Sequence, residues 1–378
     1  MALSLSRRQF AGTLGAGLGA AVLGPGVLDA ADEPQAPARL PEHPIQLNSN
    51  ENPYGPSPAA LAAMTASQRV AARYPDSNEE RLVEAIAATH MVEPEQVLLG
   101  CGSGEILRMA DMAFLGPDKS VVAAEPTFEA VLEYARVTRA RAVKVAQTAD
   151  HRHDLPAMAS ACDAATGLVY VCNPNNPTGT IVKHDELARF LEQVPKTARV
   201  LLDEAYFHFV VDEGYTSGFE WPGYPNLVVV RTFSKIYGLA GMRLGYAVST
   251  RENITAMRQH AVASNTNAAV LQAALASLQD WELVPRQRTL NVETREWLCR
   301  ELARDGRRYI PSHTNFVMFD VGGDVAPLIE AFRQEGILVG RKFPSLGAWL
   351  RVSIGTRSEM EAFLATLRRL APARSQAA

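Results

Sequence analysis

Short apolar runs alternate with amphipathic stretches between about residues 59 and 250. Each run has about the length of a strand and is rich in Val, Leu and Ala, which favours buried strands. The runs lie at residues 96–100, 120–124, 141–146, 166–172, 198–202, 226–231 and 244–248. Helical patterns lie between most of them, and two more, at 59–68 and 79–90, precede them. This alternation predicts a large α/β domain over residues 59–280, with a mostly parallel sheet flanked by helices.

The pattern changes beyond residue 250. Helical stretches rich in Ala, Leu, Arg and Glu extend to about residue 305, and a shorter mixed segment follows. Its strand-like runs lie at 315–319, 336–340 and 349–355, with helical patterns near 325–335 and 358–371. We interpret residues 281–371 as a smaller α+β C-terminal domain and residues 372–378 as a tail.

Polar or otherwise distinctive residues follow several of the predicted strands. Ser103, Phe128, Asn176, Asp203 and Lys235 each come at or shortly after the end of an apolar run. In an open α/β sheet, ligands bind outside the carboxyl ends of the strands. We therefore expect these side chains to meet in one crevice.

Lys235 stands in the sequence Thr-Phe-Ser-Lys-Ile-Tyr-Gly-Leu-Ala-Gly-Met-Arg, residues 232–243. A desolvated lysine near other cations has a lowered pKa and can form a Schiff base with an aldehyde. Thr232, Ser234 and Arg243 are suited to hold a phosphate beside it. The motif favours an anchor for pyridoxal 5′-phosphate (PLP), and the alternative is an ordinary surface lysine in a turn.

A Gly/Ser turn before a helix adds to this phosphate site. Ser103, Gly104 and Glu105 follow a short strand and precede a helical pattern from Ile106. Such a turn directs backbone N–H groups and a helix N-terminus at one point. A plain tight turn would give the same pattern.

The remaining crevice residues suit the ring of PLP. Asp203 can keep the pyridine nitrogen protonated, although an aspartate here can also cap a helix or turn. Phe128 can stack on the ring. Asn176 and Tyr206 are suited to donate hydrogen bonds to its 3′-oxygen.

Arg351 lies between apolar residues in a strand-like run, and an unpaired buried arginine is costly. Its planar guanidinium matches a substrate α-carboxylate in bidentate fashion, and Asn176 lies among the same predicted substrate contacts. The alternative is an internal salt bridge.

Composition narrows the class of protein. The chain has 378 residues, 47% of them hydrophobic, with a formal net charge of −4. These values are typical of a soluble globular protein, and the chain is long enough for two domains. We expect no nucleic-acid partner. Cys101, Cys162, Cys172 and Cys299 have the spacing of neither a metal site nor a disulfide framework, so no metal is expected.

The N-terminus resembles a twin-arginine export signal. Arg7 and Arg8 precede a Gly/Ala-rich apolar stretch at 11–28 that is too weakly hydrophobic for a stable membrane anchor. We interpret residues 1–31 as a signal peptide, read by the twin-arginine translocase, and residues 32–58 as a linker and N-terminal arm. The density of Asn, Pro and Gly at residues 45–58 predicts that the arm is irregular, without a helix or strand. This predicts a periplasmic protein exported in its folded state. The alternative is an uncleaved tail on a cytoplasmic protein.

A series of motifs in order resembles the histidinol-phosphate aminotransferase family of class I/II, fold-type I PLP enzymes. The resemblance extends from about residue 44 to residue 371. Its motifs are Asn-Glu-Asn-Pro-Tyr-Gly at 50–55, Gly-Ser-Gly-Glu at 102–105, Pro-Thr-Phe at 126–128, Asn-Pro-Asn-Asn-Pro-Thr-Gly at 173–179, Asp-Glu-Ala-Tyr at 203–206, Ser-Lys at 234–235 and Leu-Arg-Val-Ser-Ile-Gly-Thr at 350–356.

The resemblance implies a homodimer with active sites at the subunit interface, where Tyr54 reaches the PLP phosphate of the partner. It also implies that Lys235 forms the Schiff base and moves the Cα proton, and that Arg351 binds the α-carboxylate. The expected activity is ping-pong transfer of an amino group from an amino acid or related amine to a 2-oxo acid.

Two residues depart from the family pattern, in which Tyr is frequent at Phe128 and Glu at His208. These departures and the export signal predict an amino donor other than histidinol phosphate. Two alternatives remain: a PLP-dependent decarboxylase of the same branch, acting on an amino acid or its phosphate, and a non-catalytic PLP or amino-acid binding protein.

Overall fold

The computed structural model describes residues 41–220 and 224–372. Residues 1–40 lie outside these ranges and comprise the predicted signal peptide and the first nine residues of the predicted linker and arm. Residues 373–378 of the predicted tail lie outside them too. The described residues belong to one compact unit, so the predicted division into domains at residue 280 stays a prediction.

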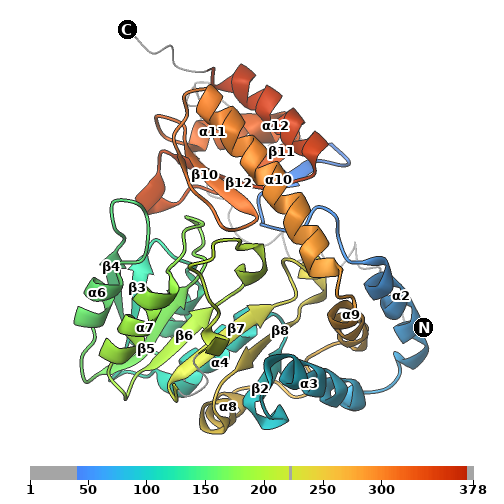
Figure 1. The fold of residues 1–378 in the computed structure, drawn as a ribbon, viewed down its shortest axis with the longest axis vertical. Coiled ribbons are helices and arrows are strands. Elements are labelled where there is room, and N and C mark those ends of the chain that lie inside the picture. The colour runs from blue at the N-terminus through green and yellow to red at the C-terminus, as the bar shows by residue number, and fades with distance from the viewer. Residues whose placement is uncertain (1–40, 221–223, 373–378) are drawn as a thin grey trace, which may run out of the picture. The chain divides into compact units, whose positions relative to one another are not determined.

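A seven-stranded sheet with the order β2-β8-β7-β6-β5-β3-β4 forms the centre of this unit (Figure 1). Its strands are β2 (Val97–Gly100), β3 (Ser120–Glu125), β4 (Arg141–Ala146), β5 (Thr166–Cys172), β6 (Arg199–Asp203), β7 (Leu227–Thr232) and β8 (Gly245–Val248). Strands β4, β3, β5, β6 and β7 pair in parallel, and β8 is antiparallel to both β7 and β2. The expected mostly parallel α/β sheet is confirmed.

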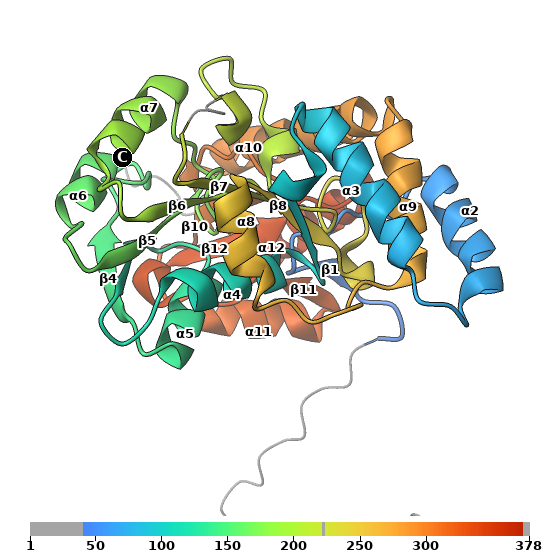
Figure 2. The same cartoon turned by 90° about the horizontal axis from the view of Figure 1, so that it is seen from below.

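Helices cover both faces of the sheet (Figure 2). One layer contains α4 (Ser103–Phe114), α5 (Ala130–Val137) and α8 (Arg251–Arg258), and the other contains α6 (Leu155–Ser160) and α7 (His184–Gln193). Side chains alternate along β3, because Val121 and Ala123 join the core with α4, whereas Val122 and Ala124 join the core with α7. Apolar residues at successive positions are therefore buried on both faces, which explains the continuous apolar runs.

A third group of helices packs at the β2–β8 end of the sheet. It consists of α2 (Pro58–Ser67), α3 (Asp76–His90) and α9 (Ala268–Gln279). Leu82 and Ile86 of α3 share one buried core with Leu271 of α9 and with Tyr246 of β8.

The C-terminal part has a separate three-stranded antiparallel sheet with the order β12-β10-β9. Its elements are α10 (Leu283–Arg304), β9 (Tyr309–Ile310), β10 (Phe316–Asp320), α11 (Ala326–Gln334), β11 (Ile337–Val339), β12 (Trp349–Ser353) and α12 (Arg357–Leu370). Figure 1 shows α10 running from the lower part of the unit up to β10 and β12. Val317, Phe319 and Phe363 lie in the core that joins this sheet to α12.

Part of the N-terminal arm is a strand. The sequence predicts an irregular arm up to Pro58, but β1 (Ile45–Leu47) pairs in parallel with β11, with Ile45 opposite Ile337. The expectation was wrong for these three residues, because so short a run shows no periodicity of its own. The pairing brings the arm across to the C-terminal part of the chain.

Within the described residues, no helix combines the length and the apolar character needed to span a bilayer.

Candidate active site

A cavity of about 510 Å³ lies where the parallel strands end, between the seven-stranded sheet and the C-terminal part. Most of the site residues expected from the sequence line it: Ser103, Gly104, Phe128, Asn176, Asp203, Tyr206, Thr232, Ser234, Lys235, Arg243 and Arg351. The strand ends therefore place side chains from distant parts of the chain around one volume.

Lys235 follows β7 and reaches into the cavity. Its Nζ donates a hydrogen bond to the Ser49 carbonyl oxygen at 3.2 Å and lies 5.7 Å from the centre of the Tyr206 ring. Burial, together with the positive charges of Arg351 and Arg243, lowers the pKa of Lys235 to about 8, and the negative charges of Glu51 and Asp203 limit the fall. The amine is therefore partly neutral near pH 8, as a nucleophile must be.

Asp203 ends β6 and is only 3% exposed. Its Oδ1 accepts a hydrogen bond from the Ala205 N–H at 3.1 Å, and its Oδ2 accepts one from the Tyr170 hydroxyl at 2.8 Å. Burial raises the pKa of Asp203, these two hydrogen bonds oppose the rise and the neighbouring charge of Glu204 adds to it, so that the pKa is about 6. The carboxylate is thus mostly ionised at neutral pH.

Close backbone packing shapes the part of the cavity suited to a phosphate. Gly102 has φ +81°, and a Cβ there would lie 2.1 Å from Arg243 Nη2. A Cβ on Gly245 would lie 2.3 Å from the Ser103 nitrogen. Helix α4 begins at Ser103 with no side-chain cap, which leaves N–H groups of its first turn available to an anion.

Arg243 completes this anion-binding surface. Its Nη1 donates to the Ala240 carbonyl at 3.0 Å and lies 3.5 Å from the Ser234 hydroxyl oxygen. It forms no ion pair with any of the residues that the structure describes. Guanidinium, hydroxyl and helix N-terminus together fit the phosphate of PLP.

Arg351 reaches the cavity from β12 and is buried. Its Nη1 donates to Asn176 Oδ1 at 2.7 Å and its Nη2 to the Asn48 carbonyl at 2.8 Å, while its buried Nε has no partner. Among residues 41–220 and 224–372 it forms no salt bridge, so the alternative of an internal ion pair is not seen there. A buried cation without a compensating anion suits a carboxylate ligand.

Tyr206 and Phe128 complete the part suited to a ring. The Tyr206 hydroxyl accepts a hydrogen bond from Asn50 Nδ2 at 3.0 Å, and burial raises its pKa, so it stays protonated. Phe128 is 39% exposed and lines the cavity, which leaves its ring face free to stack.

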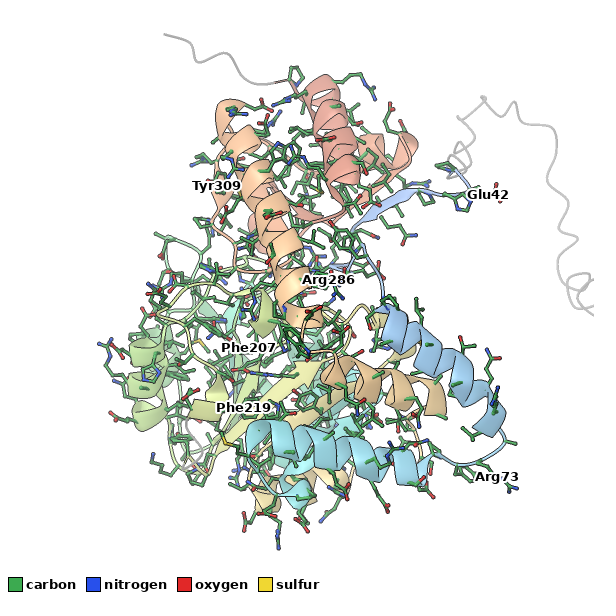
Figure 3. The ribbon with its side chains drawn as sticks, turned by 45° about the vertical axis from the view of Figure 1, so that its right-hand side comes forward. Glu42, Arg73, Phe207, Phe219, Arg286 and Tyr309 are labelled. Carbon is green, nitrogen blue, oxygen red and sulfur yellow. The ribbon has the colours of Figure 1, made fainter. Side chains whose placement is uncertain are left out.

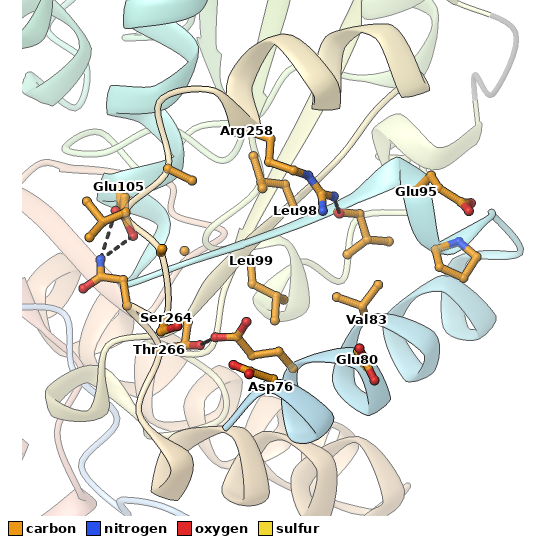
Figure 4. Close-up of a pocket in the computed structure, with 18 of the residues that line it drawn as sticks. Asp76, Glu80, Val83, Glu95, Leu98, Leu99, Glu105, Arg258, Ser264 and Thr266 are labelled. Carbon is orange, nitrogen blue, oxygen red and sulfur yellow. Dashed lines mark hydrogen bonds between the residues drawn. The ribbon is translucent and has the colours of Figure 1, made fainter. Parts of the chain in front are cut away.

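Glu105 lies outside this cavity and lines a second one, of about 700 Å³ (Figure 4). Its carboxylate accepts from the Cys101 N–H at 2.6 Å and from the Asn265 amide at 3.0 Å. Its own N–H donates to the Gly102 carbonyl at 3.2 Å. These contacts use Glu105 to shape the turn, and the expected phosphate contact stays a prediction.

Two further expectations concern residues away from the cavity. Tyr54 is 40% exposed and lies beside Gln287 of α10, so a single chain leaves its expected reach into a partner untested. His208 lies 3.4 Å from the Tyr237 hydroxyl and does not line the cavity. The expected effect of His208 on the choice of substrate stays a prediction.

Several lining residues were missed from the sequence: Asn48, Ser49, Asn50, Glu51, Thr127, Glu129, Cys172, Arg341 and Phe343. The first four are placed by the β1–β11 pairing. Arg341 forms an ion pair with Glu129 across the mouth of the cavity. Arg341 and Lys342 directly follow the apolar run at 336–340, and this pattern could have indicated that Arg341 lies near the site.

Comparison with known proteins agrees with this geometry. The sequence profile described as "Aminotransferase class I and II" matches residues 42–367. The chain is 41% identical over 330 residues to the histidinol-phosphate aminotransferase of Moorella thermoacetica, covering 86% of this chain and 85% of that one. It is also 41% identical over 329 residues to histidinol-phosphate aminotransferase 2 of Ralstonia nicotianae, covering 85% and 87%.

The fold is similar to a solved structure with bound cofactor. Histidinol-phosphate aminotransferase from Sinorhizobium meliloti, in complex with pyridoxal-5′-phosphate, superposes with a TM-score of 0.81 at 27% identity, over 86% of this chain and 91% of that one. The profile match spans most of the chain, and the cavity has the donor set that PLP requires. The chain therefore belongs to the class I and II aminotransferase family and is a PLP-dependent enzyme of fold type I.

Proposed function

We propose that this aminotransferase holds PLP through Lys235 and moves an amino group from an amino acid, or an amine derived from one, to a 2-oxo acid. The observation that carries the proposal is the content of the 510 Å³ cavity. It joins a lysine of lowered pKa, a buried carboxylate and an uncapped helix N-terminus beside an arginine. These are the groups that the aldehyde, the ring nitrogen and the phosphate of PLP need.

When bound, PLP supplies an aldehyde that condenses with amines and a protonated ring that takes up electron density from the substrate Cα. Asp203 would keep the ring nitrogen protonated. Ser103, Gly104, Ser234 and Arg243 would hold the phosphate, and Thr232 supports Ser234 through a hydrogen bond of 2.9 Å.

The protein's own groups account for substrate binding and proton movement. Lys235 has the lowered pKa that lets its Nζ accept and return the Cα proton once the substrate occupies the site. Arg351 would bind the α-carboxylate, and Asn176 holds that guanidinium in place from the loop after β5. Phe128 would cover one face of the ring, and Tyr206 would donate to its 3′-oxygen.

The relatives and the cavity both bear on the choice of amino donor. The curated relatives are named for histidinol phosphate, which makes that phosphate ester one of the first donors to test. Arg341 lines the same cavity and is paired with Glu129, so an acidic donor side chain would compete with Glu129 for it. An α-amino acid without a second anion would leave this pair intact.

We further propose that the enzyme is a homodimer in which Tyr54 contacts the partner's cofactor, and that it is exported folded to the periplasm. The dimer is supported by the family resemblance and the exposure of Tyr54. Export is supported by Arg7, Arg8 and the apolar stretch at 11–28, which precede the start of the family match at residue 42.

The test is a spectrophotometric scan of the holoenzyme, to which candidate donors are added singly without any 2-oxo acid. Loss of the visible cofactor band with one donor, and its return on adding a 2-oxo acid, would establish transamination and name the donor. Release of carbon dioxide from a donor that leaves the band in place would instead favour the decarboxylase. A variant Lys235→Ala that keeps the band and the turnover would reject the assigned anchor.

A further inference from the structure

The buried phenol of Tyr170 contacts the carboxylate that the proposed function assigns to the ring nitrogen. Strands β5 and β6 are parallel neighbours, with Cys172 opposite Asp203 and Tyr170 opposite Leu201. Tyr170 and Cys172 lie two positions apart, so their side chains project from the same face of the sheet. Tyr170 therefore lies one step further from the cavity than Cys172, beneath the end of β6.

The two oxygens of Asp203 have different donors. Oδ1 accepts the N–H of Ala205, two residues along the same chain, at 3.1 Å. Oδ2 accepts the hydroxyl of Tyr170 from the neighbouring strand at 2.8 Å. The local contact to Oδ1 alone would leave the carboxylate free to rotate about its torsion angle. The contact to Oδ2 fixes that angle.

The Tyr170 hydroxyl has two polar neighbours, the Asp203 carboxylate and the Cys172 thiol, of which only the carboxylate is a strong acceptor. The side chain is 0% exposed, and its ring packs in the apolar core with Leu107, Leu201 and Val230. Burial and the nearby charge of Asp203 raise the pKa of Tyr170 well above its ordinary value, so the phenol keeps its proton and remains a donor. A hydrogen bond donated to a carboxylate favours the charged form of that carboxylate.

We propose that Tyr170 is a positioning residue, whose hydroxyl fixes the orientation of the Asp203 carboxylate and stabilises it in the ionised state that binding of the PLP ring requires. This inference rests on the role that the proposed function gives Asp203. It adds a residue that makes no contact with the cavity but acts through one that does.

Other groups near Asp203 also affect the ionisation of its carboxylate. The titratable or charged groups facing it are Cys172 from β5, Glu204 directly after β6, Lys235 after β7, and the hydroxyls of Tyr206 and Tyr215. Glu204, next in the chain, disfavours the ionised form of Asp203.

Arg231 compensates the charge of Glu204. Its Nη2 lies 2.8 Å from the Glu204 carboxylate, and its guanidinium lies 3.8 Å from the ring centre of Phe207 and 4.7 Å from that of Phe219. Both rings lie below the lower end of α10 in Figure 3. With Glu204 paired to Arg231, the Tyr170 hydroxyl is the contact that most favours the charged form of Asp203.

The test compares Tyr170→Phe with a matched control, Tyr215→Phe. Tyr215 is also buried, and its hydroxyl donates to the Asn173 carbonyl at 2.8 Å, an uncharged acceptor. Both variants lose one buried hydroxyl and keep the ring. Holoenzyme is dialysed to equilibrium at a series of pH values, and the dissociation constant of PLP is measured from its absorbance.

Loss of a donor to the charged form raises the pKa of Asp203, so tight binding begins at a higher pH. For Tyr170→Phe we expect the acidic limb of the binding curve to move up by about one pH unit. For Tyr215→Phe we expect PLP binding to have the same pH dependence as in the wild type, even if the variant is less stable to heat. Circular dichroism of both variants confirms that each is folded.

Asp203→Asn separates this inference from the proposed function. Lys235, with a pKa of about 8, adds a pH dependence of its own, so Asp203→Asn should lose only the steeper part of the acidic limb near pH 6. If the asparagine variant loses that part and Tyr170→Phe coincides with Tyr215→Phe, Tyr170 only packs and the inference is overturned. If Asp203→Asn binds PLP with the wild-type pH dependence, the role of Asp203 itself is wrong, and the inference is overturned together with that part of the proposed function.

Discussion

The guanidinium of Arg351 donates to the side-chain oxygen of Asn176 at 2.7 Å, which joins β12 to the loop after β5 across the cavity. This contact and the one to the Asn48 carbonyl use the two terminal nitrogens of Arg351. Both acceptors are neutral, so the positive charge is oriented without being neutralised. A carboxylate that enters the cavity meets a cation already held in position.

Arg351→Ala should therefore weaken binding of the 2-oxo acid. Loss of charge-assisted hydrogen bonds predicts a KM higher by roughly 10- to 100-fold, with a smaller effect on kcat. The check is steady-state kinetics over a range of 2-oxo acid concentrations. Arg357→Ala is the control, since Arg357 pairs with Glu361 on the surface of α12. An unchanged KM would mean that Arg351 serves only to hold the two parts of the chain together.

Capture of PLP should depend on pH through Lys235. Because its pKa is lowered to about 8, the neutral amine falls about tenfold for each pH unit below that value and is nearly constant above it. The rate at which PLP-depleted enzyme regains the visible band should follow this curve. Stopped-flow absorbance measures it directly. A rate that rises only near the ordinary lysine pKa would show that Lys235 is not desolvated in solution.

Gly102→Ala should weaken PLP binding through Arg243. The new Cβ would lie 2.1 Å from Arg243 Nη2, and φ of +81° is unfavourable for alanine. Arg243 must then move away from the phosphate position, and we expect the PLP dissociation constant to rise by at least about tenfold. Gly116→Ala is the matched control, because no atom lies within 4 Å of a Cβ built there. Equal PLP affinities for the two variants would remove Arg243 from the phosphate site.

The Glu204–Arg231 pair should contribute strongly to stability. Both side chains are buried, and Ser217 donates a further hydrogen bond to Glu204 at 2.8 Å. Arg231→Met leaves a buried carboxylate without its cation, and we expect a loss of about 3–5 kcal/mol in the free energy of unfolding. The double variant with Glu204→Gln should recover much of that loss. Urea unfolding of the single and double variants tests this, and additive losses would contradict direct coupling of the two side chains.

Export is tested by changing Arg7 and Arg8 together to Lys. A twin-arginine signal should lose function when both arginines become lysines, so the enzyme should remain in the cytoplasm of a host with that pathway. Enzyme activity in periplasmic and cytoplasmic fractions measures the distribution. Unchanged recovery in the periplasm would reject the assignment of residues 1–31.

Much of the fold was predictable because burial on both faces leaves a strong signal. All seven strands of the main sheet lie within about two residues of the apolar runs, and the order of elements predicted a parallel arrangement. The rule that ligands bind at strand ends then placed Asp203 and Lys235 in one cavity.

The missed features depend on contacts between distant residues. Strand β1 has only three residues, and its partner β11 is almost three hundred positions away, so no local pattern marks it. Tyr170 is one residue of the apolar run at 166–172, and the sequence does not show which strand lies beside it. Arg341 and Glu129 meet only once both parts of the chain are in place.

The pairing of β1 with β11 also constrains the order in which the protein can fold. Ser49, which accepts from Lys235, is held over the cavity by a strand that needs residues 337–339 as its partner. The seven-stranded sheet ends at Val248 and can form earlier, from contacts that are closer in sequence. On the ribosome, a chain that has not yet emerged beyond residue 339 contains Lys235, but the segment around Ser49 is not yet held over the cavity. The cofactor can thus be enclosed only after synthesis is nearly complete.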